Sequence, residues 1–342
     1  MPSPIVLTDP EFVRPEKPSA YYRFVCKLIV DERDVPFFGT MLKISLVMWS
    51  LALLLFWPGM FRWWMAPLYW IPMFWLLPTF ILMMHSTAHR RFFRREYDWA
   101  NKLIPWFIGP FLGETPESYF SHHIGMHHPE NNLPTDKSST MGRQRDSFLS
   151  FLGYYSRFIL IGLYETSSYL FRSGRRKLAR NILVGEGVSI LVAGGLAVYC
   201  WQASLVVFVI PAFVVRFLMM AGNWGQHAFV DRNDPNNPYR NSTTFINTPY
   251  NHRAFNDGYH IGHHEDQRRH WTDMPTEFRE NKQRYIDNES AVFLGLDNFS
   301  VWLLLMLKQY AFLASRYVDL GGQKSQAQII ALLRERAQRI PA

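Results

Sequence analysis

The histidines are the residues of this sequence best suited to chemistry, because all twelve fall into four short groups. His85 and His89 stand in H-S-T-A-H, and H-H-I-G-M-H-H follows at 122–128. N-W-G-Q-H ends at His227, and the stretch Asn251–His270 holds the remaining five. Imidazole nitrogens bind iron, copper, nickel and zinc. The clustering therefore predicts one metal site assembled from distant segments of the chain.

The spacing within the groups predicts how many ions this site holds. Residues four apart lie on one face of a helix, as His85 and His89 do if the preceding apolar helix continues by one turn. Adjacent residues diverge by about 100° around a helix, so His127 and His128 should bind different ions, and so should the adjacent pair at 263–264. The predicted histidine ligands are His85, His89, His123, His127, His128, His227, His260, His263 and His264.

The donor set favours two iron ions over zinc. Nine imidazoles exceed the four ligands of a tetrahedral zinc site, and H-S-T-A-H lacks the glutamate of the H-E-x-x-H zinc peptidases. A pair of irons with open coordination positions can bind dioxygen and generate an oxidant for unactivated C–H bonds. We therefore expect two iron ions as cofactors and dioxygen as co-substrate. A transition-metal transporter or sensor and a membrane zinc hydrolase are the competing classes.

Four long apolar runs must position these histidines. Each is long enough to cross, or nearly cross, a hydrocarbon core of about 30 Å at about 1.5 Å per residue. Short turns join them into two hairpins, and four arginines in residues 90–95 place the end of the second run in the cytosol. The predicted fold is an all-α polytopic membrane protein with four transmembrane helices and a cytosolic histidine-rich cap. The four runs are Met41–Trp57, Trp63–Met84, Ile182–Cys200 and Ser204–Ala221.

The other segments are predicted to lie at the membrane surface or in the cytosol. Residues 1–40 form a cytosolic tail, 41–314 the membrane domain with its cap, and 315–342 a polar tail with a helix at Gln323–Arg339. Leu103–Leu112 is too short to span and is re-entrant or interfacial. Two further segments, Phe148–Phe171 and Ala291–Ala314, are predicted as helices in the membrane plane, with a fifth span as the alternative for the second.

Composition limits the partners. The net charge is +8, but the basic residues flank the apolar runs, which indicates a membrane face and no nucleic acid. The two cysteines have no C-x-x-C spacing, so they form neither a disulfide framework nor a thiolate metal site. The chain has no dinucleotide fingerprint, haem-attachment motif or iron–sulfur pattern, so electrons must come from a separate donor protein. The basic face suits an acidic redox partner.

The order of the motifs resembles that of a known family. H-x-x-x-H, H-x-x-x-H-H, N-x-x-x-H and H-x-x-H-H, with paired apolar runs before the first and third, resemble the integral-membrane fatty acid desaturase superfamily over roughly Met41–Pro275. The superfamily also holds acyl, alkane and carotenoid hydroxylases. The resemblance implies four membrane helices, a cytosolic cap and two irons bound by the boxed histidines. It also implies that Asn223 approaches one iron through water.

Several further residues are candidates for roles around the ligands. Asp231 and Asp257 are candidates for hydrogen bonding to the histidine ligands and orienting their rings. The equal alternative is that these acids are solvated or cap turns. His122, His252 and His270 exceed the minimal ligand set and either contact the ligands from outside or replace one of them. Arg216 lies seven residues before Asn223. The side chain of Arg216 could touch a substrate head group. The favoured alternative is that it extends to the interface between the membrane and water.

A metal site at the membrane surface predicts a substrate that resides in the membrane. We expect oxygen-dependent desaturation of a long-chain acyl lipid, narrowly ahead of acyl or alkane hydroxylation, because Pro134–Phe148 resembles the membrane alkane hydroxylases as much as the desaturases. The expected electron donor is a ferredoxin-like or small haem protein. The expected location is the endoplasmic reticulum of a eukaryote or the inner membrane of a bacterium, with the active site on the cytosolic face.

Overall fold

The computed structural model describes residues 5–341, which are mostly helical and divide into two compact units. The unit that we call the hairpin unit comprises Phe12–Gly125 and Thr166–Arg216. The other, the sheet unit, comprises the described residues up to Glu11, Met126–Glu165 and the described residues from Phe217 onward. Helices α6 (Phe148–Arg172) and α8 (Ile210–Gln226) each contain a boundary between the units.

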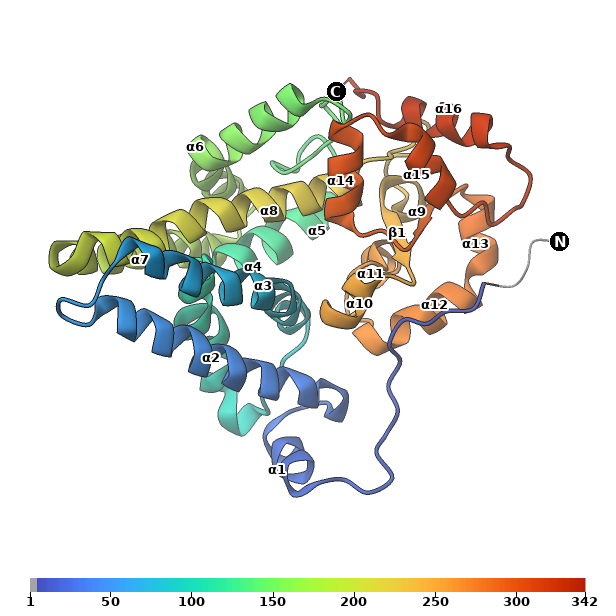
Figure 1. The fold of residues 1–342 in the computed structure, drawn as a ribbon. Coiled ribbons are helices and arrows are strands. Elements are labelled where there is room, and N and C mark those ends of the chain that lie inside the picture. The colour runs from blue at the N-terminus through green and yellow to red at the C-terminus, as the bar shows by residue number, and fades with distance from the viewer. Residues whose placement is uncertain (1–4, 342) are drawn as a thin grey trace. The chain divides into compact units, whose positions relative to one another are not determined.

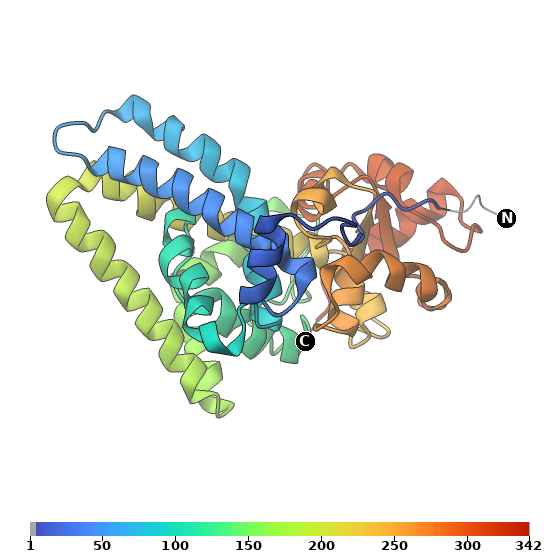
Figure 2. The ribbon, with the colours of Figure 1, turned by 90° about the horizontal axis from the view of Figure 1, so that it is seen from below.

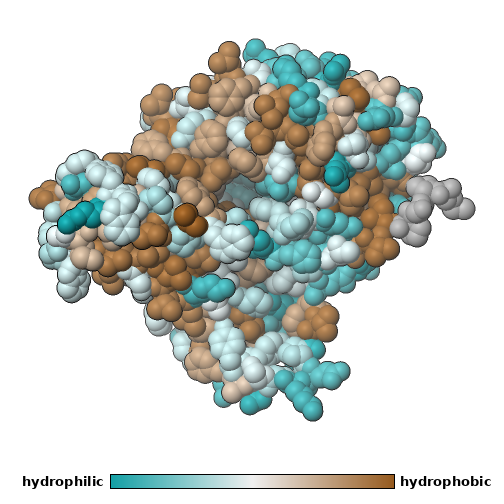
Figure 3. Space-filling view, viewed as in Figure 1, coloured by the Kyte–Doolittle hydropathy of each residue, from teal (hydrophilic) through white to brown (hydrophobic). Residues whose placement is uncertain are grey.

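Two long apolar helices pack against each other in the hairpin unit. Helix α2 (Val35–Phe56) packs against α3 (Ala66–His89), and the two lie side by side in Figures 1 and 2. The turn between them contains Gly59, whose φ of 74° favours glycine. Large apolar side chains such as Leu46 and Trp75 are exposed along these helices, and brown atoms gather over α2 in Figure 3. Such a surface is what a helix in hydrocarbon requires.

The third apolar segment contains a reversal of the chain. Helix α7 (Arg176–Ser204) leads through the π-helical turn η7 (Leu205–Val209) into α8. Cys200 has non-helical backbone angles (φ −150°, ψ 88°), and the Ser204 hydroxyl donates a 2.7 Å hydrogen bond to the carbonyl of Ala193. Eleven residues of straight helix would separate those two groups by about 16 Å, so the chain turns back here. By length and composition the described residues contain three candidate spans, Glu32–Phe56, Trp63–His89 and Arg176–Gln226, and the reversal lies within the third.

Short connecting helices complete the hairpin unit. Helix α4 (Ser118–His122) packs against α7, where a Cβ atom on Gly185 would lie 1.8 Å from the carbonyl oxygen of Pro116. The predicted interfacial segment Leu103–Leu112 forms the turns η4 (Ile104–Ile108) and η5 (Gly109–Leu112). The remaining elements are α1 (Ala20–Leu28), η1 (Glu32–Asp34), η2 (Trp63–Met65) and η3 (Arg95–Lys102).

The sheet unit is built around two short parallel strands that the all-α prediction did not contain. Strand β1 (Thr243–Ile246) pairs with β2 (Ala291–Leu294), with Thr243 opposite Ala291. The helices around them are α5 (His128–Glu130), α6, α9 (Pro238–Asn241), α10 (Pro249–Arg253), α11 (His260–Glu265), α12 (Met274–Glu280), α13 (Lys282–Asp287), α14 (Asn298–Met306), α15 (Tyr310–Arg316) and α16 (Gln326–Arg336), with the turn η8 (Trp271–Asp273) before α12. Helices α6 and α16 agree with the helices predicted from the sequence.

The predicted single helix at Ala291–Ala314 is wrong. The segment begins as β2, turns at Gly295 (φ 72°) and continues as the two short helices α14 and α15. The Asp297 side chain accepts the backbone N–H of Ser300 and so caps the start of α14. Lys308 (φ 54°) separates α14 from α15. Neither helix is long enough to span a bilayer.

Close packing holds the end of α8 in the sheet unit. Trp224 is fully buried in a cluster with Phe151 of α6 and Trp302 of α14. A Cβ atom on Gly225 would lie 2.0 Å from the backbone oxygen of Asn298, so only glycine allows α14 to lie this close to α8. The helix end that carries the third histidine group is therefore held on two sides.

Candidate metal centre

Four buried histidines from three segments form a compact cluster in the sheet unit. Their ligand nitrogens all lie within 4.8 Å of one another. The Nε2 atom of His260 lies 3.1 Å from that of His227 and 3.0 Å from that of His264. We call this set the four-histidine cluster: His127, His227, His260 and His264.

Each segment delivers its histidine through local structure. His227 continues the helical hydrogen bonding of α8, because its N–H donates to the carbonyl of Asn223 at 3.1 Å. His260 and His264 lie one turn apart on α11. That helix begins just after Gly258, where a Cβ atom would lie 2.5 Å from the backbone oxygen of Phe245 in β1.

Acceptors behind two of the rings determine which nitrogen faces the cluster. The Nδ1 atom of His127 lies 2.8 Å from a carboxylate oxygen of Asp136. The Nδ1 atom of His227 lies 3.0 Å from the backbone oxygen of Asn241. Both partners only accept hydrogen bonds, so each Nδ1 carries the proton and each Nε2 presents a lone pair. Metal-binding histidines are commonly oriented in this way.

The cluster suits a cation in both electrostatics and spacing. Burial, and then the ring of His127, lower the pKa of His227 to about 3. Burial and the neighbouring rings also lower the pKa of His260 well below its ordinary value. Neutral imidazole is the form that binds metal. For metal–nitrogen bonds of about 2.1 Å, adjacent nitrogens lie about 3.0 Å apart at right angles and about 3.4 Å apart at tetrahedral angles. The observed 3.0–3.1 Å is therefore short enough for these nitrogens to bind one ion.

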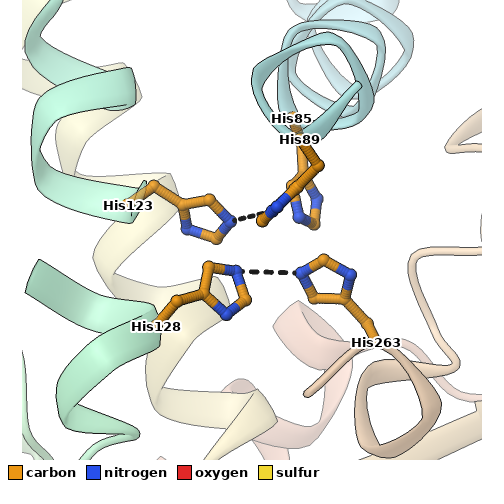
Figure 4. A group of neighbouring side chains, drawn as sticks. All are labelled: His85, His89, His123, His128 and His263. Carbon is orange, nitrogen blue, oxygen red and sulfur yellow. Dashed lines mark hydrogen bonds between the residues drawn. The ribbon is translucent and has the colours of Figure 1, made fainter. Parts of the chain in front are cut away.

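The remaining five predicted histidine ligands are also drawn together, within each unit. In the sheet unit the Nε2 atoms of His128 and His263 lie 3.0 Å apart, which Figure 4 shows as a dashed line. In the hairpin unit His85 and His89, on the last turn of α3, have ligand nitrogens within 4.8 Å of that of His123. The Nε2 atoms of His89 and His123 are 3.0 Å apart, the second dashed line of Figure 4.

Two loop residues that orient the rings, Asp136 and Asn241, were not predicted from the sequence. Asp136 lies nine residues after His127, and its second oxygen accepts the N–H and hydroxyl of Ser138. The D-x-S pattern signals this turn, but nothing in the sequence connects it with a particular histidine. Asn241 contributes a backbone carbonyl, which has no signature in the residue type.

Asp231 and Asp257, the two acids predicted to orient imidazoles, both have side-chain partners in the sheet unit. Asp231 forms ion pairs with Arg240 at 3.2 Å and Arg336 at 3.3 Å. Asp257 accepts hydrogen bonds from Gln226 and from the hydroxyl of Tyr250, each at 3.1 Å. Asp257 therefore contacts Gln226, the residue directly before His227.

Asn223 is held by the loop that contains Asp136. Its side-chain amide donates to the carbonyl of Ser138 at 3.0 Å and to the hydroxyl of Tyr154 at 2.8 Å. The amide nitrogen is thereby occupied, which leaves the side-chain oxygen of Asn223 as the atom that can bind a water or a cation.

Three further histidines lie outside the metal-capable groups of the described residues. His122 is half-buried at the end of α4, and His252 is exposed on α10. His270 is buried, and its Nδ1 accepts the N–H of Thr272 at the start of η8. His270 is therefore a helix cap.

Replacing Asp136 with asparagine should weaken metal binding by about 10–100-fold, because the ring of His127 loses a charged orienting partner. The affinity can be measured by chelator competition on the purified chain. Asp146→Asn is the matched control, since Asp146 is a buried acid of the same segment that bonds Tyr310 and Lys308. Equal loss of affinity in the two variants would contradict the orienting role of Asp136.

A comparison with protein-family models matches residues 61–295 to the model described as "Fatty acid desaturase". This range contains all four histidine groups. No curated protein and no solved structure matches the chain.

Proposed function

Because the chain belongs to the fatty acid desaturase family, we propose that it introduces a double bond into a long-chain fatty acyl lipid, using dioxygen and two electrons. Membership supports an oxidoreductase of the desaturase or hydroxylase kind that acts on an acyl lipid at a membrane. The observation that carries the proposal is the buried four-histidine cluster, in which Asp136 and Asn241 turn two ring nitrogens inward.

We propose that the chain holds two iron ions. When bound, such a pair supplies dioxygen activation and removal of hydrogen from a methylene group. The chain's own residues keep the protons of His127 and His227 on Nδ1 and exclude bulk water by burial. The proposed ligands are His85, His89, His123, His127, His128, His227, His260, His263 and His264, with Asn223 acting through water.

The proposed arrangement in the membrane has four spans in two hairpins within residues 41–314. The packed pair α2 and α3 supports the first hairpin, and the reversal after Cys200 supports the second. The arginine-rich stretch 90–95 directly follows the histidines of α3, which supports a cytosolic active-site face. The membrane would be the endoplasmic reticulum of a eukaryote or the inner membrane of a bacterium.

The proposed reaction needs a separate electron donor, a ferredoxin-like or small haem protein. The net charge of +8 supports an acidic partner, because complementary charge accelerates association at low ionic strength. Turnover that does not change with salt would count against such docking.

Lipid profiling by mass spectrometry tests the reaction. Cells that express the chain should accumulate acyl lipids that have lost two hydrogen atoms, and cells that express a His260→Ala variant should not. Acyl or alkane hydroxylation is the second candidate, because the stretch Pro134–Phe148 resembles the membrane alkane hydroxylases as much as the desaturases. Hydroxylation would appear as the gain of one oxygen atom. An unchanged lipid profile, together with exchangeable metal and no oxygen consumption by the purified chain, would favour a metal transporter or sensor.

A further inference from the structure

The N-terminal segment, residues 5–11, binds two loops that follow strand β1, one at Asn247 and one at Asn256. Asn247, directly after β1, donates from its side chain to the carbonyl of Val6 at 2.8 Å and accepts the N–H of Thr8 at 2.8 Å. The side chain of Asn256 donates to the carbonyl of Pro10 at 2.7 Å. These contacts join residues about 240 positions apart in the chain. Residues 5–11 lie outside the part of the chain that the family model matches, whereas Asn247 and Asn256 lie within it.

Asp9 is the centre of these contacts. It is 5% exposed, and its Oδ2 accepts the backbone N–H of Asn247 at 2.7 Å and the hydroxyl of Tyr259 at 2.6 Å. Tyr259 is fully buried and directly precedes His260. Its backbone carbonyl accepts the N–H of His263, so Tyr259 is part of the first turn of α11. One carboxylate oxygen is thus linked to the start of the helix that carries three predicted ligands.

The loops that Asp9 and its neighbours bind have backbone conformations that need support. Asn247 and Asn256 have φ values of 51° and 56°, and Phe255 has 47°. Residues other than glycine rarely adopt this left-handed region, and asparagine does so most readily with local hydrogen bonds. The two asparagines each use the N-terminal segment for such bonds. The orientation of α11 therefore depends on contacts that begin at Val6 and end at Pro10.

We propose that Asp9 is a positioning residue for the metal centre, acting through Tyr259 and Asn247 on the helix that presents His260 and His264. The inference rests on the proposed function only in taking these histidines as metal ligands. Asp9 touches no metal or substrate in this role. Asp9 fixes the backbone where α11 begins and therefore the direction in which the rings of His260 and His264 point.

The test measures cobalt(II) binding by the full-length chain in detergent, because the visible spectrum of cobalt reports affinity and coordination without any turnover. Asp9→Ala should weaken cobalt binding by about 10-fold, the lower end of the range for residues that act through a ligand, and should change the cobalt spectrum. Tyr259→Phe removes one of the two hydrogen bonds that Asp9 accepts and should weaken cobalt binding in the same direction, by no more than Asp9→Ala. Because the contact of Tyr259 is already lost in Asp9→Ala, the double variant should bind cobalt about as well as Asp9→Ala alone.

Glu11→Ala is the matched control. Glu11 belongs to the same segment but is exposed and pairs only with Arg279 among the described residues, so its loss should leave cobalt affinity and spectrum unchanged. Asp9→Asn retains the shape of the side chain and one acceptor oxygen, so it should bind cobalt more tightly than Asp9→Ala and less tightly than the wild type. This variant also serves as the test if Asp9→Ala fails to fold. Unchanged cobalt binding in Asp9→Asn and Tyr259→Phe, or additive effects in the double variant, would overturn the inference. A wild-type chain that binds cobalt but oxidises no lipid would overturn the proposed function and leave this inference intact.

Discussion

Replacing His264 with alanine is expected to abolish lipid oxidation and to lower bound iron from about two ions per chain to about one or fewer. His264 contacts every other ring of the four-histidine cluster, with ring centroids 5.3 Å from His127, 5.1 Å from His227 and 4.5 Å from His260. Removing it deletes one ligand and opens the space between the others. Loss of an outer partner of a ligand already costs about 10–100-fold, so we expect turnover below about 1% of wild type.

His252→Ala is the matched control for this variant. His252 belongs to the same histidine-rich stretch, but it is exposed on α10 and lies outside both metal-capable groups of the described residues. Its removal should change neither iron content, measured by elemental analysis, nor product formation. If His264→Ala retained wild-type iron and activity, the four-histidine cluster would not be the catalytic centre, whatever the family membership.

The parts of the site that the sequence predicted are those set by local periodicity. The spacing of four between His85 and His89 gives a common helical face once the apolar run continues, and α3 does end at His89. The same argument applies to His260 and His264 on α11. Apolar runs of about 20 residues predict spanning helices because bilayer thickness sets their length.

The parts that escaped prediction depend on contacts between distant segments. Asp136 and Asn241 orient rings because their loops close onto the cluster, and neither residue differs in type from many other loop residues. Asp9 lies in the predicted N-terminal tail, yet it bonds Tyr259, 250 positions later. Strand β2 was predicted as helix because its apolar side chains continue into α14, and short apolar runs do not distinguish buried strands from helices.

Arg145 is the clearest case of a residue whose importance only the folded chain reveals. Its side chain is fully buried, and its nitrogens donate to backbone carbonyls of three segments at 2.6–3.2 Å. One of these carbonyls belongs to Ala228, which directly follows His227. Among the described residues, the guanidinium donates to backbone carbonyls, whose dipoles face its positive charge. The acceptors are the carbonyls of Thr140, Met141, Ala228, Arg336 and Gln338, and more distantly that of Arg143 at 3.5 Å.

Substituting lysine at Arg145 should lower the free energy of unfolding by about 3 kcal/mol or more, because each buried carbonyl left without a donor costs about 1–3 kcal/mol. Lysine keeps the charge but lacks the planar fork that reaches three segments at once. Thermal unfolding of the metal-free chain in detergent measures the effect without any contribution from ligand loss. Arg143→Lys is the control, since Arg143 is two residues earlier and less buried, and it should change stability by less than about 0.5 kcal/mol. Equal stability of the two variants would show that the buried guanidinium does not hold these segments together. A loss of stability in Arg145→Lys alone would show that the guanidinium joins the loop after the second histidine group to Ala228, the residue that follows His227.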